Sequence, residues 1–208
     1  MRTTLKMAAV AGMFTVAGGA SAAITGVAGQ TTWLGSPPVS CNPGALTGIT
    51  AFAWDEQQNI TLATLAVDMT NNPGNSSFTI PGLLGGTFDS HFIHFEGIPG
   101  IIGVQGSVTF ATNIVGVIFK NTTLDLSDVT CGSPGTIYPT GYPFRGTNTV
   151  QPSFFSINAN VLTFNLNSLA SIAEVAQIRV ITQAVPAPGA AALLGLGGLA
   201  ICRRRRVA

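Results

Sequence analysis

The chemistry that this chain could perform depends on few ionisable side chains, among them its two histidines, His91 and His94. Both lie in the stretch FDSHFIHF, residues 88–95, three positions apart. On a helix this spacing would place both side chains on one face, where they could share a metal ion; on a strand they would point to opposite sides. The surrounding run is typical of a strand, and two ligands alone do not make a zinc site. We therefore expect no metal, with one histidine exposed and the other hydrogen-bonded in the core.

Carboxylates could act as calcium ligands or as a catalytic pair. Calcium takes oxygen ligands from loops, for which Asp89, Glu96, Asp125 and Asp128 are candidates, but no Asp-x-Asp-x-Asp spacing occurs. A glycosidase needs two carboxylates across a cleft, which the eight carboxylates of the chain would allow. The sequence contains no Gly-x-Ser-x-Gly, no His-Glu-x-x-His and no phosphate-binding glycine loop. We expect a protein without catalytic residues or cofactor, with a polysaccharide-acting hydrolase as an alternative.

Aromatic side chains could stack on sugar rings. A sugar-binding module would show exposed aromatics side by side, and the candidates are Trp33, Trp54, Tyr138 and Tyr142. Tyr138 and Tyr142 share one loop, so we identify them as the candidate ligand-binding residues of a carbohydrate-binding module, a further alternative. Ice binding is less expected, because a flat array of Thr-x-Thr rows would be needed and only residues 147–149 have that form.

These side chains would be positioned by strands. In residues 102–112, Val104, Gly106, Val108 and Phe110 alternate with polar side chains, as in a strand with one face in water. Gly106 leaves a gap on the inner side, where we expect a bend or a close approach by another segment.

Similar short runs recur between turn signals rich in Gly, Pro and Asn. They occupy residues 48–54, 60–68, 77–80, 88–96, 114–120, 154–157, 161–166 and 175–182. Together with residues 102–112 they predict an all-β fold, an antiparallel two-sheet sandwich or jelly roll. Residues 168–173 resemble a short helical turn, and residues 130–151 form a long loop rich in Pro, Gly and Thr.

The N-terminus predicts export. Arg2 and Lys6 precede an apolar run at residues 7–17, which is too short to span a bilayer. Ala20-Ser21-Ala22 then supplies the small residues that signal peptidase accepts. Residues 1–22 are therefore expected to be a signal peptide, cleaved between Ala22 and Ala23.

An exported domain lies in an oxidising environment, where two of its cysteines can form a stable disulfide. Cys41 and Cys131 are expected to form a disulfide, worth on the order of 4 kcal/mol for a loop of about 90 residues. The alternative is two separate buried thiols. Cys202 lies near the C-terminus and is expected to remain unpaired.

The charge of the body argues against nucleic acid as a partner. Residues 23–184 carry eight carboxylates and three basic side chains, a net charge of −5, while the other six bases lie in the two end segments. Affinity for nucleic acid comes largely from clustered bases that neutralise phosphates. Nucleic-acid binding is therefore not expected.

The C-terminal stretch VPAPGAAALLGLGGLAICRRRR, residues 185–206, predicts a membrane segment. Pro186 and Pro188 prevent a regular helix before them. Residues 189–202 are apolar and would rise about 21 Å as a helix, which is shorter than a typical bilayer core. Extending the segment back to Ala184 gives nineteen residues, just enough for a thin or tilted span. Arg203, Arg204, Arg205 and Arg206 would hold the C-terminus in the cytoplasm and leave the body outside.

A signal peptide, a proline-flanked motif, a Gly/Leu/Ala helix and an arginine cluster in this order resemble the PEP-CTERM sorting signal of bacterial exported proteins. The resemblance covers residues 185–208 and implies recognition by exosortase, a membrane transpeptidase that cuts near the prolines. By resemblance, the recognition residues are Val185, Pro186, Pro188 and Gly189, with the four arginines as the stop. Ala187 stands where the usual motif has glutamate, so cleavage and a permanent anchor both stay open. The stretches 88–95 and 178–182 also resemble uncharacterised β-rich bodies that carry such tails.

The organisation expected from these patterns is a signal peptide at residues 1–22, a β-sandwich at 23–184 and a sorting or anchoring segment with a transmembrane helix at 185–208. The expected function is that of a non-catalytic protein of the cell envelope or extracellular matrix. It would be held at the inner membrane during sorting and then reach the envelope, the outer surface or the matrix, where extracellular polysaccharide is a candidate partner.

Overall fold

A computed structural model of the chain describes residues 23–147 and 150–185. The expected signal peptide, its cleavage residues Ala20 and Ala22, and the tail beyond Val185, with Pro186, Pro188, Gly189, Cys202 and Arg203 to Arg206, lie outside these residues and stay predictions. In the described part of the chain, no helix has the length and hydropathy needed to cross a membrane.

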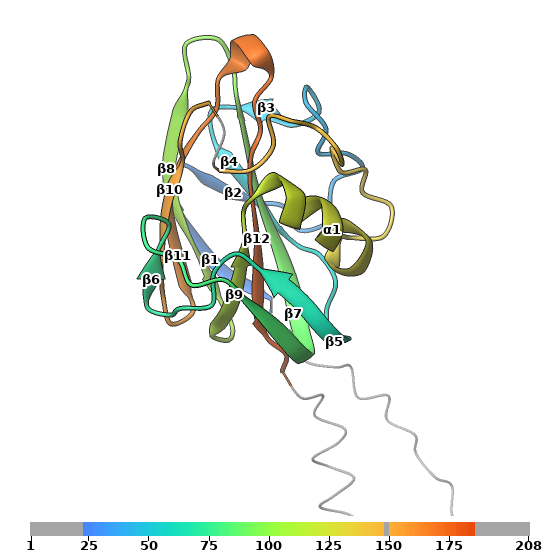
Figure 1. Cartoon of the computed structure of the whole chain (residues 1–208). Coiled ribbons are helices and arrows are strands. Elements are labelled where there is room, and N and C mark those ends of the chain that lie inside the picture. Colours follow the sequence, from blue (N-terminus) through green and yellow to red (C-terminus); the bar gives the residue numbers. More distant parts are fainter. Residues whose placement is uncertain (1–22, 148–149, 186–208) are drawn as a thin grey trace, which may run out of the picture. The chain divides into compact units, whose positions relative to one another are not determined.

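Two sheets make up most of the described chain (Figure 1). The five-stranded sheet has the order β1 (Ile24–Gly29), β8 (Gly103–Phe110), β11 (Val161–Asn167), β10 (Phe154–Asn158) and β6 (Gly74–Asn75). The seven-stranded sheet has the path β2 (Thr31–Trp33), β4 (Ala51–Asp55), β7 (Gly82–Gly97), β12 (Ala176–Gln183) and β9 (Ile114–Ile118), with β3 (Thr47–Gly48) and β5 (Ile60–Val67) also paired to β7. The pairs are antiparallel except β2 with β4 and β3 with β7. The expected all-β, two-sheet architecture is confirmed.

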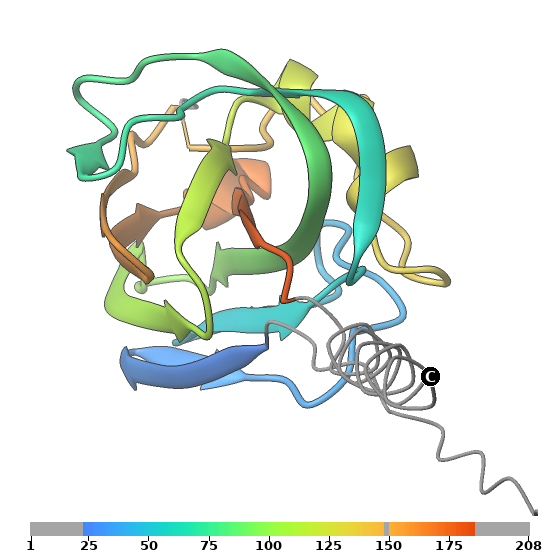
Figure 2. The ribbon, with the colours of Figure 1, turned by 90° about the horizontal axis from the view of Figure 1, so that it is seen from below.

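The main core lies between the two sheets. Ile93 of β7 and Ile178 of β12 pack there against residues of the other sheet such as Val108 and Leu162, all of them inaccessible to solvent. Side chains from both sheets fill the space that the strands surround in Figure 2. Each such side chain contributes about 1.5–3 kcal/mol when it leaves water, so this core is the main source of stability.

Gly106 is closely approached, as the sequence predicts. A Cβ atom at this position would overlap Thr31 Oγ1 and would lie 2.9 Å from the carbonyl oxygen of Ala28. The missing side chain therefore lets β1 and the start of β2 lie against β8.

A helix that the sequence pattern does not predict covers the other face of the seven-stranded sheet. It is α1 (Asn121–Cys131), which lies on the side of β7 and β12 away from the five-stranded sheet (Figure 1). Its buried residues, Leu124, Ser127 and Cys131, form one helical stripe. Because α1 and the following loop cover this face, β7 and β12 are buried on both sides over much of their length.

Several strand predictions need correction. β1, β2 and β6 lie outside the predicted runs, β3 overlaps the run 48–54 only at Gly48, and β7 is much longer than the predicted run 88–96. Residues 77–80, predicted as a strand, form none: the Asn71 side chain holds this segment, donating to Phe78 O and accepting from Ile80 N. The predicted helical turn is confirmed as a 3-10 turn at Ala170–Ile172.

Candidate functional site

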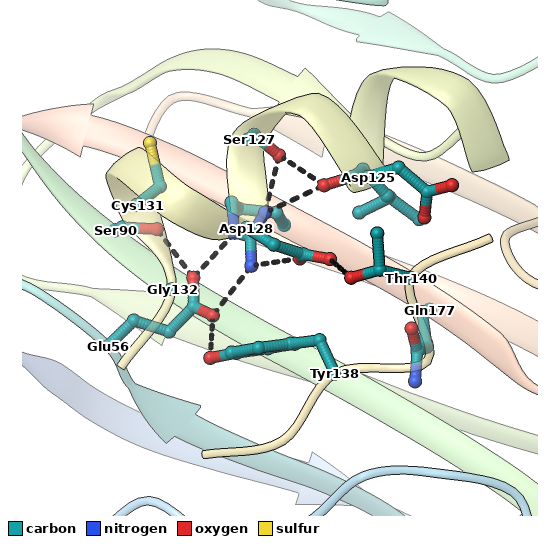
Figure 3. Close-up of polar contacts among 12 residues, drawn as sticks. Glu56, Ser90, Asp125, Ser127, Asp128, Cys131, Gly132, Tyr138, Thr140 and Gln177 are labelled. Carbon is teal, nitrogen blue, oxygen red and sulfur yellow. Dashed lines mark hydrogen bonds and ion pairs between the residues drawn. The ribbon is translucent and has the colours of Figure 1, made fainter. Parts of the chain in front are cut away.

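The densest group of ionisable side chains lies between the seven-stranded sheet and α1 (Figure 3). We call it the buried charge network, and it consists of Glu56, Asp125, Asp128, Arg145 and Arg179. The residues come from the end of β4, from α1, from the loop after α1 and from β12. Since these segments are far apart in the sequence, no local spacing of residues predicts the network.

Arg179 occupies the centre of the buried charge network. Its Nε donates to Glu56 Oε2 at 2.7 Å and its Nη2 to Glu56 Oε1 at 2.9 Å, a two-point ion pair. The guanidinium also reaches Asp128 Oδ1 at 3.1 Å, donates to Ser127 Oγ and stacks 5.0 Å from the ring centroid of Phe92. Burial alone would lower the pKa of Arg179, but Glu56 and Asp128 outweigh it and raise that pKa above its ordinary value.

Arg145 binds the helix to the loop that follows it. Its Nη1 donates to Asp125 Oδ1 and to Asp128 Oδ2, both at 2.7 Å, and its Nη2 donates to Asp128 Oδ1 at 2.9 Å. Its Nε donates to Gln177 Oε1 of β12 at 2.6 Å. One side chain thereby joins α1, the loop and the sheet.

Two hydroxyl groups donate further hydrogen bonds to the Glu56 carboxylate. Tyr138 donates to Oε1 at 2.5 Å and Ser90 to Oε2 at 2.6 Å (Figure 3). Burial, together with the negative charge of Glu56, raises the pKa of Tyr138 well above its ordinary value. Tyr138 therefore acts as a donor here and carries no charge.

This arrangement favours a structural role over catalysis. A general acid or base must reach its substrate, but both guanidinium groups are inaccessible to solvent and every carboxylate in the network accepts hydrogen bonds from the fold itself. The described hollows in the surface are lined by hydroxyl, amide, apolar and backbone groups, and no carboxylate lines them. The network can hold α1 and the loop in one orientation on the sheet.

Asp55, His91 and Thr182 form a second polar line, on the core side of β7. His91 Nδ1 lies 2.6 Å from Asp55 Oδ1, and His91 Nε2 lies 3.0 Å from Thr182 Oγ1. The order carboxylate, imidazole, hydroxyl is that of a nucleophilic triad. Here, however, Thr182 is fully buried and none of the described hollows reaches it, so the line secures the sheet interior.

The two histidines point to opposite sides of β7, as predicted, but the expectation that one is exposed is wrong. His91 faces the core between the sheets, whereas His94 faces the layer under α1, and both are inaccessible to solvent. The burial of both histidines could not be predicted, because the sequence pattern does not predict α1, which covers the second face of β7. Burial lowers the pKa of His94 to about 3, and its Nδ1 lies 2.9 Å from the Gln177 amide nitrogen.

The four candidate calcium ligands already bind other groups of the protein. Asp125 and Asp128 bind Arg145, Asp89 accepts from Asn59 N at 2.6 Å, and both oxygens of Glu96 accept from Gly44 N. Across residues 23–147 and 150–185, no three His, Cys, Asp or Glu side chains gather as a metal site.

Tyr138 and Tyr142 lie in different side-chain clusters. The ring of Tyr138 packs on Phe92, and its hydroxyl belongs to Glu56. Tyr142 packs on Phe144 and donates to Ile172 O at 2.9 Å. The structure therefore does not bring them together as an exposed stacking platform.

Cys41 and Cys131 are separate buried thiols, which corrects the expected disulfide in favour of the alternative. The Cys41 thiol donates to Ile137 O at 3.6 Å, whereas Cys131 Sγ lies 3.6 Å from Thr130 Oγ1. Burial raises the pKa of Cys41 to about 12 and also raises that of Cys131. Both thiols belong to the hydrophobic cluster that contains Trp54 and Phe92, and their burial in it accounts for both pKa shifts.

The outer face of the five-stranded sheet is exposed and polar without charged side chains, unlike the buried charge network. None of its strands contains a charged residue, and Gln105, Ser156, Thr163 and Asn165 line its surface around the half-exposed ring of Phe154. Two hollows, of about 390 and 280 Å³, lie on this face. The alternation in residues 102–112 predicts such a polar face, but the partner strands and the hollows follow from the tertiary structure.

Comparisons of the chain with protein-family models, with characterised proteins and with solved structures gave no match.

Proposed function

We propose that this chain is a non-catalytic protein of the bacterial cell envelope or extracellular matrix, exported by residues 1–22 and sorted or anchored by residues 185–208. The observation that carries the non-catalytic part is the use of its charged groups. In the described chain, the five members of the buried charge network bind one another, and the hollows at the surface are lined by uncharged groups.

A hydrolase acting on polysaccharide is the alternative, and it would need two carboxylates beside a cleft. Two candidate pairs occur among the described residues: Glu56 and Asp128 share Arg179 as a donor, and Asp125 and Asp128 share Arg145. A guanidinium group that is inaccessible to solvent lies between the carboxylates of each pair, and Asp125 and Asp128 belong to α1 itself. This geometry favours a binding or coat protein over an enzyme.

The sorting part of the proposal is supported by the order of sequence signals and by where the fold ends. β12 is the last strand in the described residues and ends at Gln183, two residues before the proline motif begins at Val185. In the sequence, the motif therefore follows the described sandwich almost without a linker. Cleavage near Pro188 would release the complete sandwich, and retention of the tail would tether it.

Fractionation of the producing cells tests this proposal. The protein is located in inner membrane, outer envelope, matrix and medium, and its two termini are determined by mass spectrometry. We expect a start at Ala23 and, in the outer or matrix fraction, an end near Pro188; an intact Ala208 confined to membranes would favour the anchor.

A pair of variants makes the test specific. Replacing Pro186 and Pro188 together by Ala is expected to hold the protein in the inner membrane with its C-terminus intact. Pro99→Ala, in an exposed turn of the body, is the matched control and should be sorted normally. A protein that stays in the cytoplasm and keeps residues 1–22 would disprove the proposal.

A further inference from the structure

The outer face of the five-stranded sheet presents uncharged polar side chains in rows. In one row, Ser156 of β10 stands opposite Thr163 of β11, and Thr163 opposite Ser107 of β8. In the next row, Asn165 stands between Phe154 and Gln105. Because side chains alternate along each strand, these rows point to solvent while Leu162 and its equivalents fill the core.

Two adjoining hollows join the rows into one trough. The larger, about 390 Å³, is lined by residues from β6, β10, β11 and β8, and the smaller, about 280 Å³, by residues from β11, β8 and β1. Gln105, Thr163 and Phe164 line both. With strands about 4.8 Å apart, the trough crosses about 19 Å of sheet, long enough for a short run of an extended polymer.

Three polar side chains of the trough are available to a ligand, whereas Asn75 and Ser76 of its lining already accept hydrogen bonds from the backbone. Elsewhere the amides of Gln57, Asn72 and Gln177 are bound to backbone carbonyls. Among the residues that the structure describes, the side chains of Gln105, Thr163 and Asn165 have no hydrogen-bond partner in the protein. Amides and hydroxyls both donate and accept, so the trough can match a surface of alternating hydroxyl groups.

Phe154 supplies a flat apolar surface at the same place. Its side chain is 53 % exposed and lines the larger hollow, while its neighbour Phe155 points inward and packs on Phe119 at 5.1 Å between ring centroids. The buried neighbour fixes the strand that carries the exposed ring. An exposed aromatic ring next to amide and hydroxyl groups suits a ligand that has both apolar and hydroxyl-bearing faces.

The chemistry of the trough selects among ligand classes. Anionic polymers are bound through Lys and Arg, and the strands β1, β6, β8, β10 and β11 contain neither. A protein partner would need a larger apolar centre than the trough offers, because Phe154 is the one exposed phenyl ring among the residues that line its two hollows. A sugar chain without charge presents hydroxyl groups and apolar C–H faces, which match the amides, hydroxyls and ring.

We propose that this trough binds a neutral polysaccharide chain, with Phe154 stacking on a sugar ring and Gln105, Thr163 and Asn165 bonding to its hydroxyls. This inference rests on the proposed function, because an exported body would meet such polymers outside the cell. It replaces Tyr138 and Tyr142 as the sugar-contacting residues.

Binding of defined oligosaccharides to the full chain in mild detergent tests the inference. The probes are neutral hexasaccharides of β-glucan, α-glucan, mannan and galactan, with hexagalacturonate as the anionic comparison, measured by calorimetry up to 1 mM. We expect at least one neutral probe to bind, with hexagalacturonate at least tenfold weaker.

Three variants locate the binding site. Phe154→Ala is expected to weaken binding about tenfold or more, the loss typical of an anchoring aromatic, whereas Phe154→Tyr retains most of it. Asn165→Ala should weaken it severalfold. Trp33→Ala is the matched control, because it removes an aromatic of similar exposure, 48 %, from β2 of the other sheet and should leave binding unchanged.

Each outcome bears on one proposal. Absence of binding to every neutral probe, a preference for hexagalacturonate, or equal binding by wild type and Phe154→Ala would overturn the inference, provided that circular dichroism shows each protein folded. Inhibition of ice growth by the wild type but not by Thr163→Ala, without sugar binding, would also overturn it. Localisation and C-terminal processing do not depend on this assay, so they still decide the proposed function by themselves.

Discussion

Arg179 and Glu56 form a two-point ion pair whose two side chains are completely shielded from solvent. The pair joins β12 to the end of β4, strands that lie on either side of β7, and it passes over Phe92 of that central strand. A buried pair gains little net stability over apolar residues, but removal of one partner leaves a charge without compensation. The pair therefore specifies how the layer under α1 is assembled.

We expect Arg179→Met to reduce the free energy of unfolding by about 3–5 kcal/mol, because Glu56 would remain buried without its ion-pair partner. Glu56→Gln should cost less, since Arg179 keeps Asp128 as a counter-charge and the amide oxygen still accepts hydrogen bonds, although the amide NH2 group replaces one acceptor. Urea unfolding of the single variants and of the double variant gives the coupling energy. Lys120→Ala is the control: it removes an exposed ammonium group that lies 3.9 Å from the buried Asp68, and it should cost no more than about 1 kcal/mol. A coupling energy near zero would contradict the assignment.

Asp68 stabilises the start of α1 from the end of β5. Its Oδ2 accepts from Phe119 N and Lys120 N, both at 2.9 Å, and its Oδ1 accepts from Thr123 Oγ1 at 2.9 Å. Helix starts leave backbone N–H groups without partners, and Lys120 at the N-cap position provides no side-chain acceptor.

Asp68→Ala is therefore expected to cost about 1–3 kcal/mol and to speed amide hydrogen exchange in the first turn of α1 more than in β8. Asp68→Asn keeps one acceptor oxygen and should lie between the variant and the wild type. Uniform exchange across α1 and β8 in Asp68→Ala would show that the carboxylate has no local role at the helix start.

His94 is expected to make the protein less stable in mild acid. Burial, reinforced by the positive charge of Arg145, lowers its pKa from 6.5 to about 3. Between these values the unfolded chain binds a proton that the folded chain does not, so the free energy of unfolding falls as pH falls below 6.5. The expected loss between pH 7.5 and pH 5 is about 2 kcal/mol, at no more than about 1.4 kcal/mol per pH unit.

Unfolding in urea at several pH values measures this dependence. In His94→Gln the loss over the same range should be smaller by that amount, because every other titratable group is the same in both proteins. An identical pH dependence in wild type and variant would rule out His94 as its source.

The two body thiols are expected to be unreactive in the folded protein. A thiolate is the reactive form, and burial raises the pKa of Cys41 to about 12 and that of Cys131 in the same direction. Iodoacetamide at pH 8 should modify neither residue until urea unfolds the chain, after which both react. Peptide mapping without reductant provides the check, and a linked pair of peptides containing Cys41 and Cys131 would show that the disulfide forms after all.

The local pattern of the sequence was sufficient for those features that depend on neighbours along the chain. The alternation around Gln105 and Ser107 predicts a strand with a wet face, and the structure confirms it, because the pleat sends successive side chains to opposite sides. The gap at Gly106 is likewise confirmed as a close approach, since a residue without a side chain is what such an approach requires. The opposite orientations of His91 and His94 follow from the same two-residue period.

The tertiary structure decided whatever depends on residues far apart in the sequence. α1 has a polar sequence without a local cap, and it is held by Asp68, by Arg145 and by Arg179 from other segments. The burial of His94 and the ion pair between Glu56 and Arg179 both require that α1 covers the second face of β7. Since the sequence pattern does not predict α1, it predicts neither of them. Period-two alternation reports which side of a strand a residue takes, but only long-range packing determines what lies on each side.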